Sequence, residues 1–152
     1  MDNLTTTFII IRHAERESTE TDSNLSSDGL LRAEALSHTL SNVAVNAIYS
    51  TPYNRTRQTV KSLANEKGII ITEYSIQKQY EDFVNEILVE NLGKVVVIVG
   101  HCFTIPDIVK TLSKNSFAPT ITEDQYDDLF IISHSNKLSP TIIQLKYGRI
   151  YR

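Results

Sequence analysis

Hydrophobic and polar positions change their spacing in blocks along this chain. Short, mostly apolar runs rich in isoleucine and valine alternate with longer segments in which apolar residues recur every three or four positions. Unbroken β-branched runs are typical of strands buried on both faces, whereas the longer spacing is typical of amphipathic helices. The runs lie at residues 8–12, 46–49, 69–74 and 95–99, and the helical segments lie at residues 28–42, 52–67, 80–92 and 104–112.

The last part of the chain follows a different pattern. Residues 129–132 and 141–147 are two strand-like runs separated by the polar segment 133–140, which predicts a terminal hairpin. Before it, strands and helices alternate, and right-handed crossovers then place helices on both faces of a mostly parallel sheet. We therefore expect an α/β three-layer sandwich with a C-terminal hairpin. The length of 152 residues predicts a single domain over residues 1–152.

Hydroxyl side chains mark the expected helix starts. Ser26 or Ser27 is a natural N-cap for the first helix, and Ser50-Thr51 before Pro52 predicts the start of the second. Thr104, with Asp107 three residues later, resembles a capping box for the last helix. In each case we expect the hydroxyl oxygen to accept a hydrogen bond from a backbone N–H of its own helix.

Charge and composition narrow the class of protein. The net charge is −3 at pH 7, and the lysines and arginines are scattered, so we expect no nucleic-acid partner. No segment has the length of a membrane span, and we expect no membrane partner. The lone cysteine, Cys102, allows no internal disulfide. The chain does not open with a basic segment followed by an apolar one, so we expect a cytoplasmic protein; a signal removed from the sequence would leave the same pattern.

Two of the strand-like runs end in histidines, and these carry the candidate chemistry. Arg12 ends the first run and His13 follows it, His101 comes shortly after the fourth run, and Arg55 falls in the first turn of the second helix. In open α/β sheets, ligands bind beyond the carboxyl ends of the strands, so we expect these four side chains to converge. Guanidinium groups bind phosphate through a planar fork, and a helix N-terminus adds N–H donors. The expected ligand is a phosphoryl group, bound without a metal or cofactor.

Histidine chemistry then indicates a reaction. A neutral imidazole is a competent nucleophile, so His13 is the candidate for a phosphohistidine intermediate. His101 is placed to hydrogen-bond the oxygens of the transferring group, where charge accumulates in the transition state.

Four motifs follow one another in chain order: Arg12-His13-Ala14-Glu15, Leu25-Ser26-Ser27-Asp28-Gly29, residues 50–59 and Val99-Gly100-His101. Together they resemble the histidine phosphatase superfamily, which has the phosphoglycerate mutase-like fold. The similarity is greatest to the small bacterial branch that includes phosphohistidine phosphatases. The resemblance implies that His13 is the nucleophile, that Arg12 and Arg55 bind phosphate, and that His101 is the second histidine of the site. Where that branch has a Gly-His-Ser-Asn-Thr-like segment, this chain has Cys102 and Phe103 after His101.

The other titratable residues are expected at the surface, in a turn, or among the candidates for a general acid. His38 and Arg57 are expected at the surface, and His134 is expected to lie away from the site. The general acid that would protonate a leaving oxygen is sought among Glu15, Glu17, Glu81 and Asp82, of which Glu81 is the candidate we name. Tyr126 precedes the fifth strand, where we expect a turn.

The sequence therefore predicts a metal-independent phosphatase that hydrolyses a phosphomonoester or a phosphohistidine. Its partner would be a small phosphorylated substrate or a phosphohistidine protein. Two alternatives stay open. One is a pseudo-enzyme that only binds a phosphorylated partner. The other is a phosphoglycerate mutase, which is disfavoured because the larger mutases carry long insertions that this short chain lacks.

Overall fold

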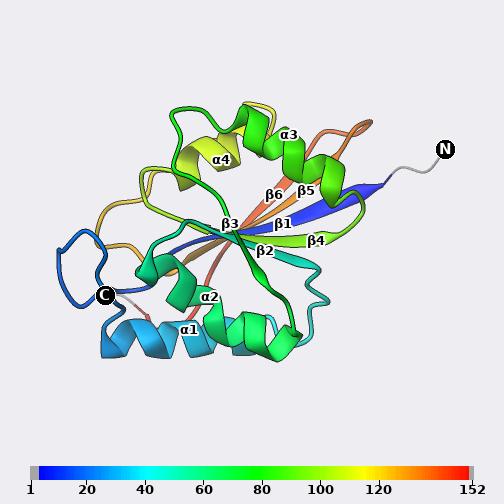
Figure 1. Ribbon diagram of the computed structural model, residues 1–152. Helices are drawn as coiled ribbons and strands as arrows, with labels where there is room; N and C mark the ends of the chain where they lie inside the picture. The colour runs from blue at the N-terminus through cyan, green and yellow to red at the C-terminus, as the bar shows by residue number, and fades with distance from the viewer. Residues whose placement is uncertain (1–3, 151–152) are drawn as a thin grey trace.

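The computed structural model describes residues 4–150, which form one six-stranded sheet between two layers of helices (Figure 1). The strands lie in the order β3-β2-β4-β1-β5-β6. Strands β1 to β4 are parallel to one another, whereas β5 is antiparallel to both β1 and β6. In chain order they are β1 Thr5–Arg12, β2 Ala47–Ser50, β3 Ile71–Glu73, β4 Val95–Gly100, β5 Asp128–Ser135 and β6 Thr141–Lys146.

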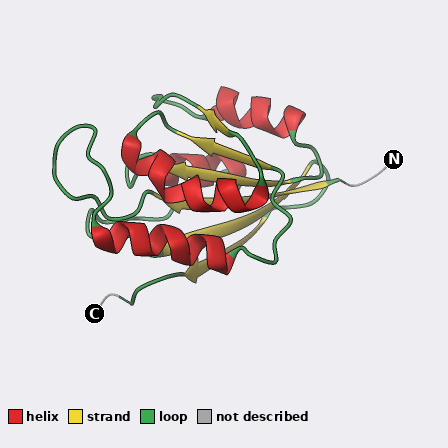
Figure 2. Ribbon diagram, turned by 60° about the horizontal axis from the view of Figure 1, so that its bottom comes forward, coloured by secondary structure: helices red, strands yellow, loops and turns green. Residues whose placement is uncertain are grey.

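The helices form two pairs on opposite faces of the sheet. Helices α1 and α2 cover one face, and α3 and α4 cover the other (Figures 1 and 2). The expected α/β three-layer sandwich, with a mostly parallel sheet and a C-terminal hairpin, is confirmed. The helices are α1 Ser27–Thr39, α2 Asn54–Lys67, α3 Glu81–Glu90 and α4 Ile105–Leu112.

The side chains of β1 alternate between two hydrophobic clusters. Phe8 and Ile10 pack into the cluster under α3 and α4, and Ile9 and Ile11 pack into the cluster under α1 and α2. All four side chains are at most 2% exposed. Because successive side chains of a strand point to opposite faces, an unbroken apolar run is what a strand covered on both faces requires.

Two helix starts differ from the expectation, and the difference bears on the site. The N-cap of α2 is Tyr53, with no side-chain hydrogen bond, instead of Ser50 or Thr51. Thr104 is the N-cap of α4, but it makes no capping bond to that helix. Both threonine hydroxyls are hydrogen-bonded to His101 instead: Thr51 Oγ1 to the ring atom Nε2, and Thr104 Oγ1 to the backbone N. Only Ser26 caps as predicted, since its hydroxyl accepts a hydrogen bond from Gly29 N.

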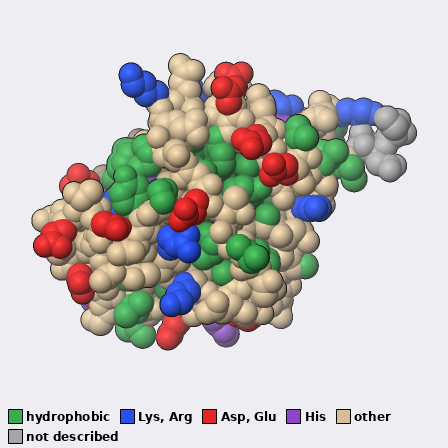
Figure 3. All heavy atoms as spheres, in the orientation of Figure 1, with side chains coloured by type: hydrophobic (Ala, Val, Ile, Leu, Met, Phe, Trp, Pro, Cys, Tyr) green, Lys and Arg blue, Asp and Glu red, His purple; other side chains and the backbone are tan. Residues whose placement is uncertain are grey.

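Loops gather at the carboxyl ends of β1, β2 and β4, at the left of Figure 1. On the face that Figure 3 shows, lysine and arginine side chains are scattered among acidic ones and form no continuous stripe. Among residues 4–150, no helix combines the length and the apolar character needed to cross a bilayer.

Candidate active site

The register of β1 and β4 places the two histidines side by side. Arg12 lies opposite Gly100 in this parallel pair, and His13 N donates to Gly100 O at 2.8 Å. The next residues to leave the sheet are therefore His13 and His101, whose ring centroids lie 5.4 Å apart. A Cβ on Gly100 would come within 2.9 Å of Thr104 Oγ1 and Ile105 Cδ1, so glycine is needed at this strand end.

His13 is held in a form that suits a nucleophile. Its Nδ1 lies 2.7 Å from Ala14 O, and because a carbonyl only accepts, Nδ1 carries the proton and Nε2 keeps its lone pair. The side chain is almost fully buried. Burial, together with the neighbouring Arg12, His101 and Arg55, lowers the pKa of His13 to about 3, against the opposing effect of the Ala14 carbonyl. The ring is therefore neutral at physiological pH.

His101 is bound from both sides of its ring. Nδ1 lies 3.4 Å from Arg55 Nη2, which can only donate, and Nε2 lies 2.9 Å from Thr51 Oγ1. The proton of this ring is thus on Nε2, which donates to the Thr51 hydroxyl. Burial, followed by the charges of Arg55, Arg12 and Arg16, lowers the pKa of His101 to about 3.

The Thr51 hydroxyl belongs to a short buried chain of hydrogen bonds. Thr51 Oγ1 lies 2.8 Å from Thr56 Oγ1, and Thr56 Oγ1 donates to Thr51 O at 2.9 Å. Thr51 and Thr56 are both fully buried. Since the Thr56 proton is given to the backbone, the Thr51 proton goes to Thr56, and Thr51 is left to accept from His101. This chain of hydrogen bonds could not be predicted from the sequence, because it joins Thr51 to His101, 50 residues further along.

The two arginines complete the cluster and are themselves held by backbone carbonyls. Arg12 Nη1 donates to Glu123 O and Gln125 O, both at 2.7 Å, and Arg55 Nη1 donates to Thr21 O at 2.7 Å. The Nε atoms of both arginines are buried and make no hydrogen bond to any residue between 4 and 150. A buried donor without a partner costs about 1–3 kcal/mol. Arg12, His13, Arg55 and His101, called the basic cluster below, therefore form a site that an anion would complete.

The remaining motif residues hold the loop that follows β1. Thr59 Oγ1 accepts from Ala14 N at 2.8 Å, and Gln58 Oε1 accepts from Leu25 N at 2.8 Å. A Cβ on Gly29 would lie 2.0 Å from Glu15 O, so only glycine allows α1 to approach this loop. These contacts fix the backbone on either side of His13.

Glu15 forms an ion pair that holds the loop after β1. Its carboxylate binds Arg32 through Nε–Oε1 at 2.8 Å and Nη2–Oε2 at 3.2 Å. Arg32 is 2% exposed and also donates to Tyr147 O, which ties the loop after β1 to the end of β6. This bidentate ion pair leaves Glu15 poorly suited to give a proton to a leaving group.

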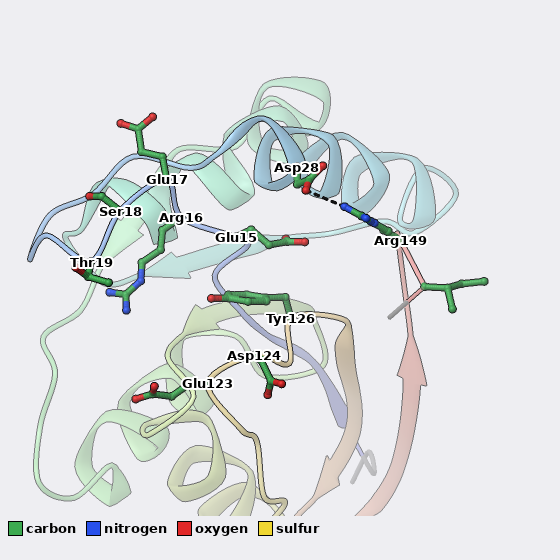
Figure 4. Close-up of a pocket in the computed structure, with 11 residues that line it drawn as sticks. Glu15, Arg16, Glu17, Ser18, Thr19, Asp28, Glu123, Asp124, Tyr126 and Arg149 are labelled. Atoms are coloured by element: carbon green, nitrogen blue, oxygen red, sulfur yellow. Dashed lines mark hydrogen bonds and ion pairs between the residues drawn. The ribbon is translucent and has the colours of Figure 1, made fainter. Parts of the chain in front are cut away.

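A cavity of about 930 Å³ opens beside the basic cluster (Figure 4). We call it the outer cavity. Tyr126 links the two, because its ring lies 4.0 Å from the Arg12 guanidinium carbon and 5.9 Å from the His13 ring. The expectation of a simple turn at Tyr126 is therefore incomplete. The lining residues are Glu15, Arg16, Glu17, Ser18, Thr19, Asp28, Glu123, Asp124, Tyr126, Arg149 and Ile150.

Arg16 is a third guanidinium near the cluster that sequence reasoning did not single out. Its side chain makes no hydrogen bond or ion pair within residues 4–150. After burial, the charge of Arg16 is the largest influence lowering the pKa of Arg55. Figure 4 shows the guanidinium near Thr19, at one end of the cavity. Its position directly after the Arg-His-Ala-Glu motif was the available signal.

The structure does not bring Glu81 to the site, which corrects the expectation of a general acid there. Glu81 is exposed at the start of α3 and lines a different cavity together with Lys114 and His134. The buried residues of α3 are Phe83, Val84 and Ile87, whereas Glu81 is exposed. His134 pairs with Thr6 at the opposite end of β1 from His13, as expected for a residue outside the site.

The two surface expectations agree with the structure. His38 is exposed on α1, and Arg57 is partly exposed and pairs with Glu73 at 2.5 Å. Within residues 4–150, no three His, Cys, Asp or Glu side chains gather as metal ligands would.

Comparison with protein families identifies the segment that carries most of the site. The model of the histidine phosphatase superfamily (branch 1) matches residues 8–76, which include Arg12, His13 and Arg55. The resemblance drawn from the motifs is therefore confirmed. His101 lies beyond the matched segment. Among curated protein sequences, none matches this chain.

Solved structures share the fold at low sequence identity. The protein histidine phosphatase SixA, complexed with tungstate, is 14% identical with a TM-score of 0.73, covering 92% of this chain and 96% of that one. A mycobacterial glucosyl-3-phosphoglycerate phosphatase is 14% identical with a TM-score of 0.69, covering 85% and 90%. A phosphoglycerate mutase from Bacillus anthracis str. Sterne is 12% identical with a TM-score of 0.73, covering 95% and 94%. These likenesses establish the phosphoglycerate mutase-like fold.

Proposed function

We propose that this protein is a metal-independent phosphatase acting through a phosphohistidine intermediate at His13, and the match of residues 8–76 to the model of the histidine phosphatase superfamily (branch 1) supports this proposal. Its substrate is a phosphomonoester or a phosphohistidine, carried by a small molecule or by a protein. The observation that carries this proposal is the basic cluster itself. Two neutral imidazoles stand 5.4 Å apart beside two guanidiniums whose buried Nε atoms have no partner.

The first half of the reaction transfers the phosphoryl group to the protein. The Nε2 lone pair of His13 forms a bond to phosphorus while the bond from phosphorus to the leaving atom breaks, and that electron pair departs with the leaving group. Arg12 and Arg55 offset the charge on the phosphoryl oxygens, which is the role a metal ion would otherwise fill. Because His13 is neutral before substrate binds, no deprotonation step is needed.

The second half of the reaction hydrolyses the phosphohistidine and regenerates free His13. Water attacks the phosphorus, the bond to Nε2 breaks, and the electron pair returns to the ring. One water molecule is consumed: its hydroxide part leaves in inorganic phosphate, and its remaining proton balances the charge on the leaving group.

The test is a phosphatase assay over small phosphate esters and phosphohistidine peptides. Wild type should release inorganic phosphate in the presence of EDTA, and His13→Ala should release none. His38→Ala is the matched control, since it removes an exposed histidine from α1, and it should retain wild-type turnover. Phosphate release by His13→Ala at the wild-type rate would reject His13 as nucleophile, and tight phosphate binding without turnover would indicate a binding protein.

A further inference from the structure

Three aromatic side chains stand around the two histidines, and one of them has an exposure that packing does not explain. Tyr53 meets His101 edge-on at 5.5 Å, Phe103 stacks on His101 at 5.3 Å, and Tyr126 lies 5.9 Å from His13. We call these three residues the aromatic rim. They come from the N-cap of α2, the turn before α4 and the loop before β5.

Phe103 differs from the other phenylalanines. It is 61% exposed, whereas Phe8, Phe83 and Phe130 are at most 6% exposed and Phe117 packs against a core cluster. Burial of a phenyl side chain stabilises a folded protein, so the exposure of Phe103 forgoes a large stabilisation. The neighbouring His101 is only 1% exposed.

Hydrogen bonds hold the backbone of the turn that carries Phe103. Thr104 N and Ile105 N both donate to His101 O, at 3.0 and 2.9 Å. Thr104 Oγ1 accepts from His101 N at 3.0 Å. The planes of the Phe103 and His101 rings are inclined by only 22°, so the two rings are nearly parallel. The phenyl ring therefore presents a flat apolar surface next to a histidine that would contact the phosphoryl group.

The other two rings are already engaged by arginines. The Arg55 guanidinium carbon lies 4.7 Å from the centre of the Tyr53 ring, and that of Arg12 lies 4.0 Å from the Tyr126 ring. Both tyrosines are half-buried. Phe103 is therefore the member of the rim with a large surface left to contact a ligand.

The outer cavity, which Tyr126 of the aromatic rim lines, carries an excess of acidic side chains. Five carboxylates and two guanidiniums line it. Glu17, Glu123 and Asp124 form no ion pair with another described residue, whereas Arg149 is already paired with Asp28 at 2.8 Å. A leaving group with a second negative charge would meet net repulsion there.

We propose that Phe103 is a stacking platform for the leaving group, and that the substrates carry their phosphoryl group directly on a planar aromatic ring without a second negative charge. This inference rests on the proposed function, because it assumes that the phosphoryl group occupies the basic cluster. An aryl ester oxygen and an imidazole nitrogen both satisfy it. Stacking of aromatic rings is worth about 0.5–1.5 kcal/mol, which corresponds to about a two- to tenfold preference.

Phosphonates test the platform without any dependence on leaving-group chemistry. Phenylphosphonate and cyclohexylphosphonate have similar size, but only the former is planar, and neither is hydrolysed. By calorimetry, wild type should bind phenylphosphonate about two- to tenfold more tightly than cyclohexylphosphonate. Phe103→Leu should abolish the preference, Phe103→Tyr should retain it, and Leu31→Ala, which alters an equally exposed residue on α1, should not change it.

Binding of inorganic phosphate tests the phosphatase proposal separately from the stacking platform at Phe103. All the variants should bind it with wild-type affinity, because Phe103 does not contribute to the basic cluster. Equal affinity of wild type for the two phosphonates, or a preference that survives in Phe103→Leu, would overturn the platform while leaving the phosphatase proposal intact. Failure of wild type to bind inorganic phosphate at all would overturn both.

Peptide substrates then distinguish the two sources of an aromatic leaving group. Phosphotyrosine and phosphohistidine peptides of one sequence should both be hydrolysed faster than the phosphoserine peptide. Phe103→Leu should slow the two aromatic substrates by about two- to tenfold and leave phosphoserine hydrolysis unchanged. Preferential turnover of the phosphoserine peptide would contradict the proposal.

Discussion

Thr51 Oγ1 lies 2.9 Å from His101 Nε2, at the end of a chain of hydroxyl groups that is fully buried. Hydroxyl chains can reverse, because each hydroxyl both donates and accepts. In the structure the chain holds the His101 proton on Nε2. Once an anion replaces Arg55 at Nδ1, the reversed chain would let Thr51 donate to Nε2 and would favour the other neutral tautomer of His101, whose single ring proton is on Nδ1 and can be donated to a phosphoryl oxygen.

Replacement of Thr51 by valine should therefore damage catalysis while conserving shape. The variant leaves a buried ring nitrogen without a partner, which costs about 1–3 kcal/mol, or about a five- to hundredfold loss in kcat/KM. Thr51→Ser keeps the hydroxyl and should restore activity. Imidazole nitrogen NMR with phosphate bound would report the tautomer directly. Equal activity in the valine and serine variants would show that the hydroxyl does not act through His101.

Arginine geometry at position 55 should matter beyond its charge. Arg55→Lys keeps the charge but loses the fork that reaches Thr21 O and the His101 ring, so kcat/KM should fall about tenfold to a thousandfold. Arg57→Lys makes the same change on a partly exposed residue of the same helix and should have little effect. Matching activities for the two lysine variants would remove Arg55 from the site.

Acid should destabilise the fold through the two buried histidines. Their pKa values are lowered from 6.5 to about 3, so between those values the unfolded chain binds more protons than the folded one. The free energy of unfolding should thus rise as the pH increases from 3 to 6.5. Each histidine contributes at most about 1.4 kcal/mol per pH unit.

Denaturant unfolding at a series of pH values measures this slope. His13→Asn and His101→Asn should each show a shallower dependence than wild type in this window. Slopes identical to wild type in both variants would mean that the histidines are not held neutral by burial.

The rate of forming the intermediate should depend steeply on the leaving group. Glu15 is paired with Arg32 and Glu81 lies in another cavity, so neither is placed to donate a proton. General-acid assistance is typically worth about a hundredfold to ten-thousandfold. A series of substituted phenyl phosphates should show the rate falling as leaving-group pKa rises, with Glu81→Gln unchanged. A flat series that steepens in Glu123→Gln would instead assign a general acid to the outer cavity.

Strand positions and the residues at their ends could be predicted because they depend on local pattern. The apolar run of β1 places His13 at the edge of the sheet, and pairing with β4 brings His101 to the same edge. The position of Arg55 could be predicted in the same way, because it lies in the first turn of α2. These inferences need only the periodicity of the chain and the parallel topology.

The supporting contacts could not be predicted because they depend on how loops fold back. Thr51 was expected to cap α2, but the buried ring of His101 competes for its hydroxyl. Tyr126 was expected in a turn, and its contact with Arg12 bridges more than a hundred residues. Glu81 was misplaced because a helical stripe fixes which side of α3 is buried, but not where its flanking carboxylates lie relative to a distant site.

Trapping the intermediate is the most direct test of the account. Wild type mixed with a labelled aryl phosphate and quenched within milliseconds should carry an acid-labile, base-stable phosphoryl group, and peptide mapping should place it on His13. The label should be absent from His13→Ala and present in His38→Ala. A phosphoryl group mapped to another residue, or steady turnover by wild type with no label formed on His13, would contradict the mechanism.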